Sequence, residues 1–207
     1  ALVPEPPELL VAKGERPQFR NPRINACKST LTTAEKCSLL YRKRGTRTYV
    51  KAYTDGSAKW ATDHRRALAG WAVYYADSHR WNASGPLEGM RQNSFRAEVR
   101  AIIQVLLTAN EPTWIFSDCQ SAVEAVNATI RGEPPPNDDQ DLWTIVTNAL
   151  HGVPDDYFCI EWIPAHTDSK QNNKIQAKIK WLNQEGHTMD DIQANWKVDK
   201  MAGRAVS

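Results

Sequence analysis

The sequence contains no hydrophobic run long enough to cross a membrane and no internal repeat. It also lacks the basic-then-apolar leader of a secretory signal, although that absence excludes little in a chain that opens at Ala1 rather than at Met. We therefore expect no membrane partner. We expect a location inside the cell, in the cytoplasm or the nucleus, or within a virion, rather than secretion.

Cysteine and histidine are scarce and scattered. The four cysteines, Cys27, Cys37, Cys119 and Cys159, form no C-x-x-C pair, and the five histidines do not cluster. A structural zinc site needs such a cluster, so the sequence does not predict one. Cys119 and Cys159 lie within apolar segments, which favours buried, reduced thiols over disulfides and therefore a reducing compartment.

Charge is unevenly distributed, although the net charge is only +2. Residues 1–50 hold ten Lys and Arg against four Asp and Glu, whereas residues 51–207 hold sixteen against twenty. The proline-containing segment 1–47 is predicted to be a basic linker, with a short helix at 31–40 and a basic loop at 41–47. Two interpretations of this arm stay open: a solvated tail, or a segment that contacts a phosphate backbone.

From residue 48 the hydrophobic pattern predicts one α/β domain, 48–207. Three extended segments come first, and helices then alternate with two short apolar strands. The order predicts a mixed five-stranded sheet, an antiparallel three-strand meander followed by parallel strands, flanked by helices. The predicted strands are 49–54, 69–76, 80–86, 113–118 and 157–163, and the predicted helices are 94–110, from 121, 141–150, 172–184 and from 195.

Four acidic residues are placed where an α/β sheet collects its ligands. Asp55 and Asp118 each follow a predicted strand. Glu98 lies at the margin of the apolar stripe of one helix, and Asp199 lies in the last helix. Taken singly, each acid also fits a turn, a helix cap or a water-facing position. Together they indicate two Mg²⁺ ions and phosphoryl-transfer chemistry, because converging carboxylates repel one another unless cations neutralise them.

Asp55-Gly56 is also the strongest local signal for a tight β-hairpin. The SAKWATDHRR stretch that follows is polar and does not alternate until Ala69, so an immediate second strand is not predicted. We therefore expect the strand to end at Asp55, with Gly56 leaving the backbone bare for the close approach of substrate.

Six motifs occur in the order of one known family: YTDGSA at 53–58, AGWAVYY at 69–75, QNSFRAEVRAI at 92–102, IFSDCQSAV at 115–123, WIPAH at 162–166 and NWKVDKMAG at 195–203. On these motifs, residues 48–207 resemble the type 1 ribonuclease H domain of retroviral and retrotransposon reverse transcriptases. The resemblance implies a ribonuclease H-like fold and endonucleolytic hydrolysis of the RNA strand of RNA/DNA hybrids by two-metal-ion catalysis. It implies two Mg²⁺ ions per site, with Mn²⁺ as a substitute. It also implies a reverse transcriptase polymerase domain as partner, in the same polyprotein or complex.

Carried over residue by residue, the resemblance implies that Asp55, Glu98, Asp118 and Asp199 are the catalytic metal ligands, with Asp55 bridging both ions. It implies that His166 assists proton transfer or product release. Selectivity for RNA would come from contacts to 2′-hydroxyls across the minor groove. The resemblance places the hybrid near the main chain of Gly56 and Ser57 and near four polar side chains, Gln92, Asn93, Ser94 and Gln120.

The sequence departs from the family pattern at several positions. Ser94-Phe95 stand where two adjacent amides are frequent, and Phe95 is more simply a core residue. The usual turn between the first two strands is replaced by AKWATDHRRAL, whose arginines either reach a phosphate or are solvated. The interval from His166 to Asp199 is longer than usual, and its basic segment 168–192 is either an extra packed helix or a hybrid-binding handle.

Three functions remain open. The first is an active, hybrid-specific ribonuclease. The second is a non-catalytic ribonuclease H-like module for assembly or nucleic-acid binding, against which the retained acids argue, because a scaffold has no need of clustered repulsive charges. The third is another nuclease or an integrase on the same fold, which would share the metal chemistry but not the RAE and PAH…VDK motifs.

Overall fold

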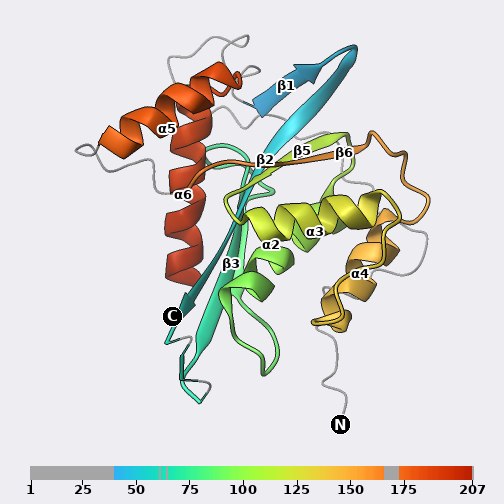
Figure 1. Cartoon of the computed structure of the whole chain (residues 1–207), viewed down its shortest axis with the longest axis vertical. Helices are drawn as coiled ribbons and strands as arrows, with labels where there is room; N and C mark the ends of the chain where they lie inside the picture. The colour runs from blue at the N-terminus through green and yellow to red at the C-terminus, as the bar shows by residue number, and fades with distance from the viewer. Residues whose placement is uncertain (1–39, 61, 64, 166–172, 207) are drawn as a thin grey trace.

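The structure is a computed structural model that describes residues 40–60, 62–63, 65–165 and 173–206. Figure 1 shows a twisted sheet with helices on both of its faces. The predicted α/β class is confirmed, because every strand and helix predicted from residue 48 onward has a counterpart. The strands are β1 (Tyr41–Arg44), β2 (Arg47–Lys59), β3 (Leu68–Tyr74), β4 (Ala83–Pro86), β5 (Thr113–Ser117) and β6 (Phe158–Trp162). The helices are α2 (Ser94–Thr108), α3 (Gln120–Ile130), α4 (Gln140–Leu150), α5 (Asn173–Gln184) and α6 (Met189–Ala205).

The sheet contains the predicted meander and parallel strands, with a sixth strand added. Its order is β4-β3-β2-β5-β6, and β1 pairs with β2 outside this path. Strands β4, β3 and β2 pair antiparallel, whereas β5 lies parallel to β2 and β6 lies parallel to β5. Strand β2 is therefore central, with β3 on one side and β5 on the other.

Strand β1 replaces the basic loop that was predicted at 41–47. It pairs antiparallel with the start of β2, from Arg44 opposite Arg47 to Tyr41 opposite Val50. The residue before it, Leu40, is only 1 % exposed and belongs to the main core. The basic side chains of β1 break the apolar alternation by which a strand is recognised, so the sequence pattern does not predict a strand here. Residues 40–44 thus belong to the folded body.

We expect a chain that starts at residue 46 to be less stable than one that starts at residue 40. The shorter chain loses Leu40 from the core, and removing a buried leucine side chain costs about 2–5 kcal/mol. Thermal unfolding followed by circular dichroism should show a Tm lower by about 4 °C or more. Leu40→Ala in the longer chain should reproduce most of the loss. Equal Tm values for the two chains would contradict a structural role of β1.

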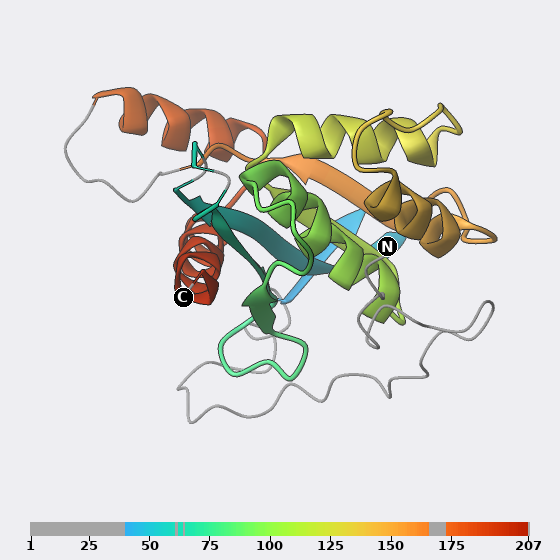
Figure 2. The same cartoon turned by 90° about the horizontal axis from the view of Figure 1, so that it is seen from below.

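The two faces of β2 are buried against different helices. Val50 and Ala52 belong to a core that also includes residues of α2, α3 and α4, whereas Tyr49 and Tyr53 belong to a second core with α5 and α6. Figures 1 and 2 show the same layering, with α6 on one side of the sheet and α2, α3 and α4 on the other. Because strand side chains alternate between faces, Asp55 shares the α6 face with Tyr53.

Helix α2 buries its basic side chains as well as its predicted apolar stripe. Arg96 forms a 2.7 Å ion pair with Asp139, just before α4, and Arg100 forms a 3.1 Å ion pair with Glu88. Both arginines are buried. Phe95 packs against the main core, as expected for a core residue. Ion pairs on one side and apolar contacts on the other fix α2 on the sheet.

Helix α6 begins at Met189, well before the predicted start at residue 195. Thr188 is its N-cap: its side chain accepts from the main-chain N–H of Asp191, and the Asp191 side chain accepts from the N–H of Thr188. This reciprocal capping box satisfies two of the backbone donors that a helix start leaves unpaired. The pattern Thr-x-x-Asp is therefore a start signal that the sequence prediction missed.

Helix α5 lies within the predicted insert 168–192 and packs on the body through its C-terminal part. Leu182 is buried in the second core, and Ile179 packs against it. Trp181 contacts Trp162 at the end of β6, with ring centroids 5.8 Å apart. Lys180 is exposed. These contacts favour the extra packed helix, and the hybrid-binding handle stays a prediction. None of the helices in the described ranges is both long and apolar enough to span a membrane.

Candidate metal centre

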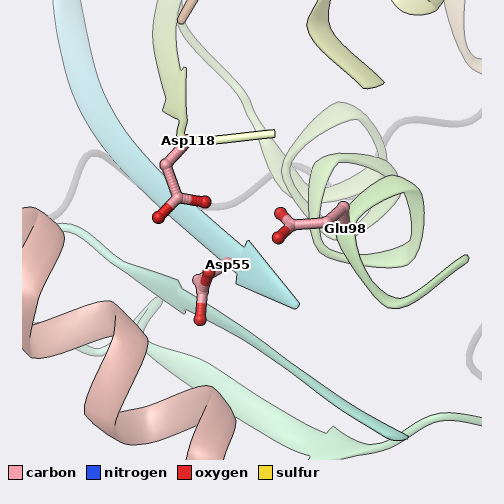
Figure 3. A group of neighbouring side chains, drawn as sticks. All are labelled: Asp55, Glu98 and Asp118. Carbon is pink, nitrogen blue, oxygen red and sulfur yellow. The ribbon is translucent and has the colours of Figure 1, made fainter. Parts of the chain in front are cut away.

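Three acidic side chains from separate elements meet at one place. Asp55 comes from β2, Glu98 from α2, and Asp118 directly follows β5. Each offers a carboxylate oxygen, and these oxygens lie within 4.8 Å of one another. Figure 3 shows the three side chains pointing toward one another. Asp55 and Glu98 are buried and Asp118 is half-buried, so the cluster reaches solvent through Asp118.

Asp55 lies at the point where the parallel partner of β2 stops. Thr54 pairs with Ser117, the last residue of β5. Strand β2 itself continues to Lys59 beside β3, so the predicted end of the strand at Asp55 is wrong. The strand that ends at the site is β5. Its carboxyl end places Asp118 beside Asp55, at the edge where α/β sheets bind ligands.

Gly56 is required by the packing of α2 on β2. A Cβ atom at this residue would lie 2.3 Å from the main-chain nitrogen of Glu98 and 2.6 Å from the carbonyl carbon of Ala97. Non-bonded atoms do not approach so closely, so only glycine allows α2 to lie here. The missing side chain at Gly56 makes room for the protein's own helix, which is a structural reason for this glycine in addition to the predicted one, room for substrate. A main-chain contact from Gly56 to the hybrid stays a prediction.

Burial and mutual repulsion favour the protonated forms of these acids. Burial, followed by the charges of Asp118 and Asp199, raises the pKa of Asp55 to about 8. Burial, followed by the charges of Asp55 and Asp118, raises the pKa of Glu98 well above its usual range. The main-chain N–H of Gly56 favours the ionised forms of both carboxyls and partly opposes both pKa shifts. The cluster therefore carries a repulsion that a bound cation would relieve.

The donor set fits a hard divalent cation. The cluster of Asp55, Glu98 and Asp118 contributes carboxylate oxygens only, with no His or Cys in it. Mg²⁺ takes carboxylate oxygens and keeps part of its water shell, for which the solvent-facing side of Asp118 leaves access. The three acids are held by β2, α2 and the end of β5 rather than by long loops, so their spacing is rigid. They are the residues that would hold such an ion.

Asp199 lies outside this group of three, but its charge reaches Asp55. It is half-buried on α6, and its charge is one of the causes that raise the pKa of Asp55. The structure thus brings three of the four predicted acids together and places the fourth nearby. His166, the predicted proton-transfer residue, lies outside the described residues.

Two of the predicted substrate residues already have structural roles. The Oε1 atom of Gln92 accepts from the N–H of Ala69 at 2.8 Å, and its amide nitrogen donates to the carbonyl oxygens of Leu87 and Gly89. Asn93 is the N-cap of α2, because its side chain accepts from the main chain of that helix. These bonds fix the approach to α2, and a further role with the hybrid stays a prediction.

The other predicted substrate side chains face solvent. Ser94 and Gln120 are exposed as the first residues of α2 and α3, and Gln120 donates to Glu124 at 2.7 Å. Ser57 is half-buried on β2, two residues beyond Asp55. All three lie within four residues of an acid of the cluster. Their contact with a hybrid stays a prediction.

Two supporting contacts were not predicted from the sequence. The indole Nε1 of Trp162 donates to the carbonyl oxygen of Asp118 at 3.0 Å, and Ser117 Oγ donates to Glu98 Oε2 at 3.4 Å. Trp162 belongs to the WIPAH motif, but the motif does not reveal this contact. The pairing of β6 with β5 places Trp162 opposite Ser117, and its indole then reaches the main chain of Asp118. The thiols of Cys119 and Cys159 are free, as predicted, although both are half-buried rather than buried.

Comparison with known proteins identifies a family and a fold. A protein-family model described as RNase H matches residues 47–178. No curated protein matches the chain. A solution structure of the RNase H domain of PFV is similar, with 18 % identity over 75 % of this chain and 93 % of that domain and a TM-score of 0.50.

Two longer solved chains are similar as well. The native protease-reverse transcriptase of prototype foamy virus matches with 19 % identity over 75 % of this chain and a TM-score of 0.50. A CSH mutant of that protein matches with 18 % identity over 80 % of this chain and a TM-score of 0.51. The match covers only 20 % and 22 % of those two chains. At such identities the likeness establishes the fold, which is the one that the sequence motifs predicted.

Proposed function

This chain belongs to the RNase H family, and we propose that it hydrolyses the RNA strand of RNA/DNA hybrids endonucleolytically. The observation that carries the proposal is the buried cluster of Asp55, Glu98 and Asp118. We further propose that the chain is the ribonuclease H part of a retroviral or retroelement reverse transcriptase. The similar foamy virus chains, which join a protease to a reverse transcriptase, support this assignment.

The proposed catalytic residues are the four acids, with His166 assisting proton transfer or product release. Asp55, Glu98, Asp118 and Asp199 would hold two divalent ions, which we propose to be Mg²⁺, with Mn²⁺ as a substitute. When bound, these ions would neutralise the carboxylates, lower the pKa of the attacking water and stabilise the charge on the leaving oxygen. The chain itself supplies rigid positions, because β2, α2 and β5 each fix one acid. Since protons compete with the ions for Asp55, metal affinity should rise with pH up to about 8.

The same cluster argues against a non-catalytic module. A module that only bound nucleic acid or another protein would have no use for clustered acids whose burial and mutual repulsion raise the pKa of Asp55 to about 8. Another nuclease on the same fold would use similar acids, so the choice of nucleic acid must be tested directly.

The test is cleavage of a hybrid labelled on its RNA strand, with Mg²⁺ or Mn²⁺ present. We expect the native protein to leave 5′-phosphate and 3′-hydroxyl ends, and Asp55→Asn and Asp118→Asn to lower the rate at least about a hundredfold. Asp138→Asn, at an exposed loop position, is the matched control and should cleave normally.

Each alternative outcome points to a different conclusion. Equal cleavage rates for the native protein and all variants would show that these acids are not catalytic. No cleavage by the native protein with either ion would favour the non-catalytic module. Faster cleavage of double-stranded DNA than of the hybrid would favour another nuclease.

A further inference from the structure

A buried ion pair joins β2 to α6 on the strand that carries Asp55. Lys51 Nζ lies 2.8 Å from Asp191 Oδ1, and the two residues are 4 % and 3 % exposed. The hydroxyl of Tyr53 donates to the same carboxylate oxygen at 2.5 Å. The other oxygen, Oδ2, accepts from the N–H of Thr188 in the capping box. The first turn of α6 is therefore bonded to two residues of β2.

The turn between α5 and α6 is held from further directions. His187 is buried, with its Nε2 atom 2.9 Å from Glu161 Oε1 on β6. Arg42 of β1 donates to the carbonyl oxygen of Glu185 at 3.3 Å. These contacts fix the N-terminus of α6 relative to β1 and β6 as well as β2.

Stability alone does not explain a buried ion pair. Removing two charges from water costs about as much as their attraction returns, and apolar replacements of such pairs are often as stable or more so. The best-attested use of buried polar pairs is to fix the register between packed elements.

The pair fixes the register in which Asp199 meets Asp55. Lys51, Tyr53 and Asp55 alternate along β2 and so share one face. From Lys51 to Asp55 the strand advances about 13 Å, and from Asp191 to Asp199 the helix advances about 12 Å. Helix α6 contacts β2, and Figure 1 shows both running toward the same end of the molecule. Bonding Asp191 at Lys51 therefore brings Asp199 to the level of Asp55.

The C-terminal end of α6 is fixed by close packing. A Cβ atom at Gly70 on β3 would lie 2.7 Å from the carbonyl carbon of Ala205. Asp199 lies between these two fixed ends. A slip of one residue would rotate α6 by about 100° and move it by about 1.5 Å. Val198 or Lys200 would then replace Asp199 beside Asp55.

We propose that Lys51, Tyr53 and Asp191 are positioning residues that set the register of α6 on β2 and so carry Asp199 to the metal site. The proposal rests on the proposed function, because that function makes Asp199 a metal ligand. It assigns a role to the start of α6, which the family motifs around Asp199 do not include.

The test is the double variant Lys51→Met with Asp191→Asn. It removes both charges, but the oxygen of the new asparagine can still accept from the N–H of Thr188, and its amide nitrogen can donate to the hydroxyl of Tyr53. We expect a native circular dichroism spectrum and a Tm within about 5 °C of the native value. By isothermal titration calorimetry, Mg²⁺ should bind about tenfold more weakly. Mn²⁺ should broaden the amide NMR signals of both Glu98 and Asp199 in the native protein, and in the variant the broadening at Asp199 should be weaker relative to that at Glu98.

Lys197→Met is the matched control. It removes a more exposed ion pair between α6 and Asp77, 2.8 Å long, and should leave Mg²⁺ affinity unchanged. If the double variant does not fold, Tyr53→Phe removes one bond to Asp191 without leaving a charge unpaired. We expect it to weaken Mg²⁺ binding about threefold.

Several outcomes would overturn the proposal. Native Mg²⁺ affinity together with unchanged broadening at Asp199 in these variants would do so, and so would an equal loss of affinity in Lys197→Met. If Mn²⁺ leaves Asp199 unbroadened in the native protein, the register proposal fails even when hybrid cleavage is normal. If ions bind as expected but no hybrid is cleaved, the proposed function fails and the register proposal stands.

Discussion

Asp55→Asn is expected to make the cation-free protein more stable while it removes cleavage. In the native protein, burial and the charges of Asp118 and Asp199 oppose ionisation of Asp55 and raise its pKa to about 8. Asparagine has a similar shape but adds no charge to the cluster. Because the substitution removes a buried charge that its neighbours repel, the Tm measured in EDTA at pH 8 should rise by several degrees.

The size of this gain should depend on pH. The folded-state pKa of Asp55 is about 8 and its ordinary value is 3.8, so between these values the unfolded chain binds fewer protons than the folded one. Native stability without cations therefore falls as pH rises from about 4 to about 8, and then levels off. The difference between Asp55→Asn and the native protein should be largest at pH 8 and should nearly vanish at pH 4.

Added Mg²⁺ should reverse the order of stability. The native protein gains free energy from binding the ion, whereas Asp55→Asn has lost a ligand and gains less. Differential scanning calorimetry at pH 5 and pH 8, with EDTA or with Mg²⁺, measures all of these changes. Asp138→Asn, at an exposed position, should follow the native protein throughout. A cation-free Asp55→Asn protein that melts below the native one at pH 8 would show that the carboxylate stabilises the fold.

The parts of the fold that were predictable are those with local apolar patterns. Strands β3, β5 and β6 are short apolar runs, and α2 has a clear helical stripe, so periodicity was enough to place them. The acids of the site were found because each lies within a family motif. Asp55 alone has the local signature of a turn, and only its distant neighbours give it a chemical role.

What escaped prediction depends on partners far along the chain. Arg96 and Arg100 are buried because ion pairs accept them, which a helical wheel does not reveal. Lys51 and Asp191 are 140 positions apart, so no sequence window holds both. Strand β1 is different, because its residues have no apolar alternation and its extended form is stabilised by pairing with β2. The start of α6 is the exception, because the capping box of Thr188 and Asp191 is a local pattern that predicts a helix start.

Gly56→Ala is expected to damage both stability and activity. The new methyl group would lie 2.3 Å from the main-chain nitrogen of Glu98, and its other close neighbours belong to Ala97, so α2 must move away from β2. Forcing an atom into a packed interface costs about 1–3 kcal/mol or more, which corresponds to a Tm lower by at least several degrees. The residue displaced is the one that supplies the Glu98 carboxylate, and misplacing a catalytic group by about 1 Å can cost about a hundredfold in rate.

Gly203→Ala is the matched control for this substitution. Gly203 lies in α6, where a Cβ atom would meet no neighbour within 4 Å, so alanine should be neutral or slightly stabilising there. Hybrid cleavage and thermal unfolding, measured on both variants, separate the contact from the general effect of replacing glycine. The loss of rate in Gly56→Ala should persist at temperatures well below its Tm, because Glu98 is displaced in the folded protein. A Gly56→Ala protein that cleaves normally once it is folded would show that α2 can move without disturbing the acids.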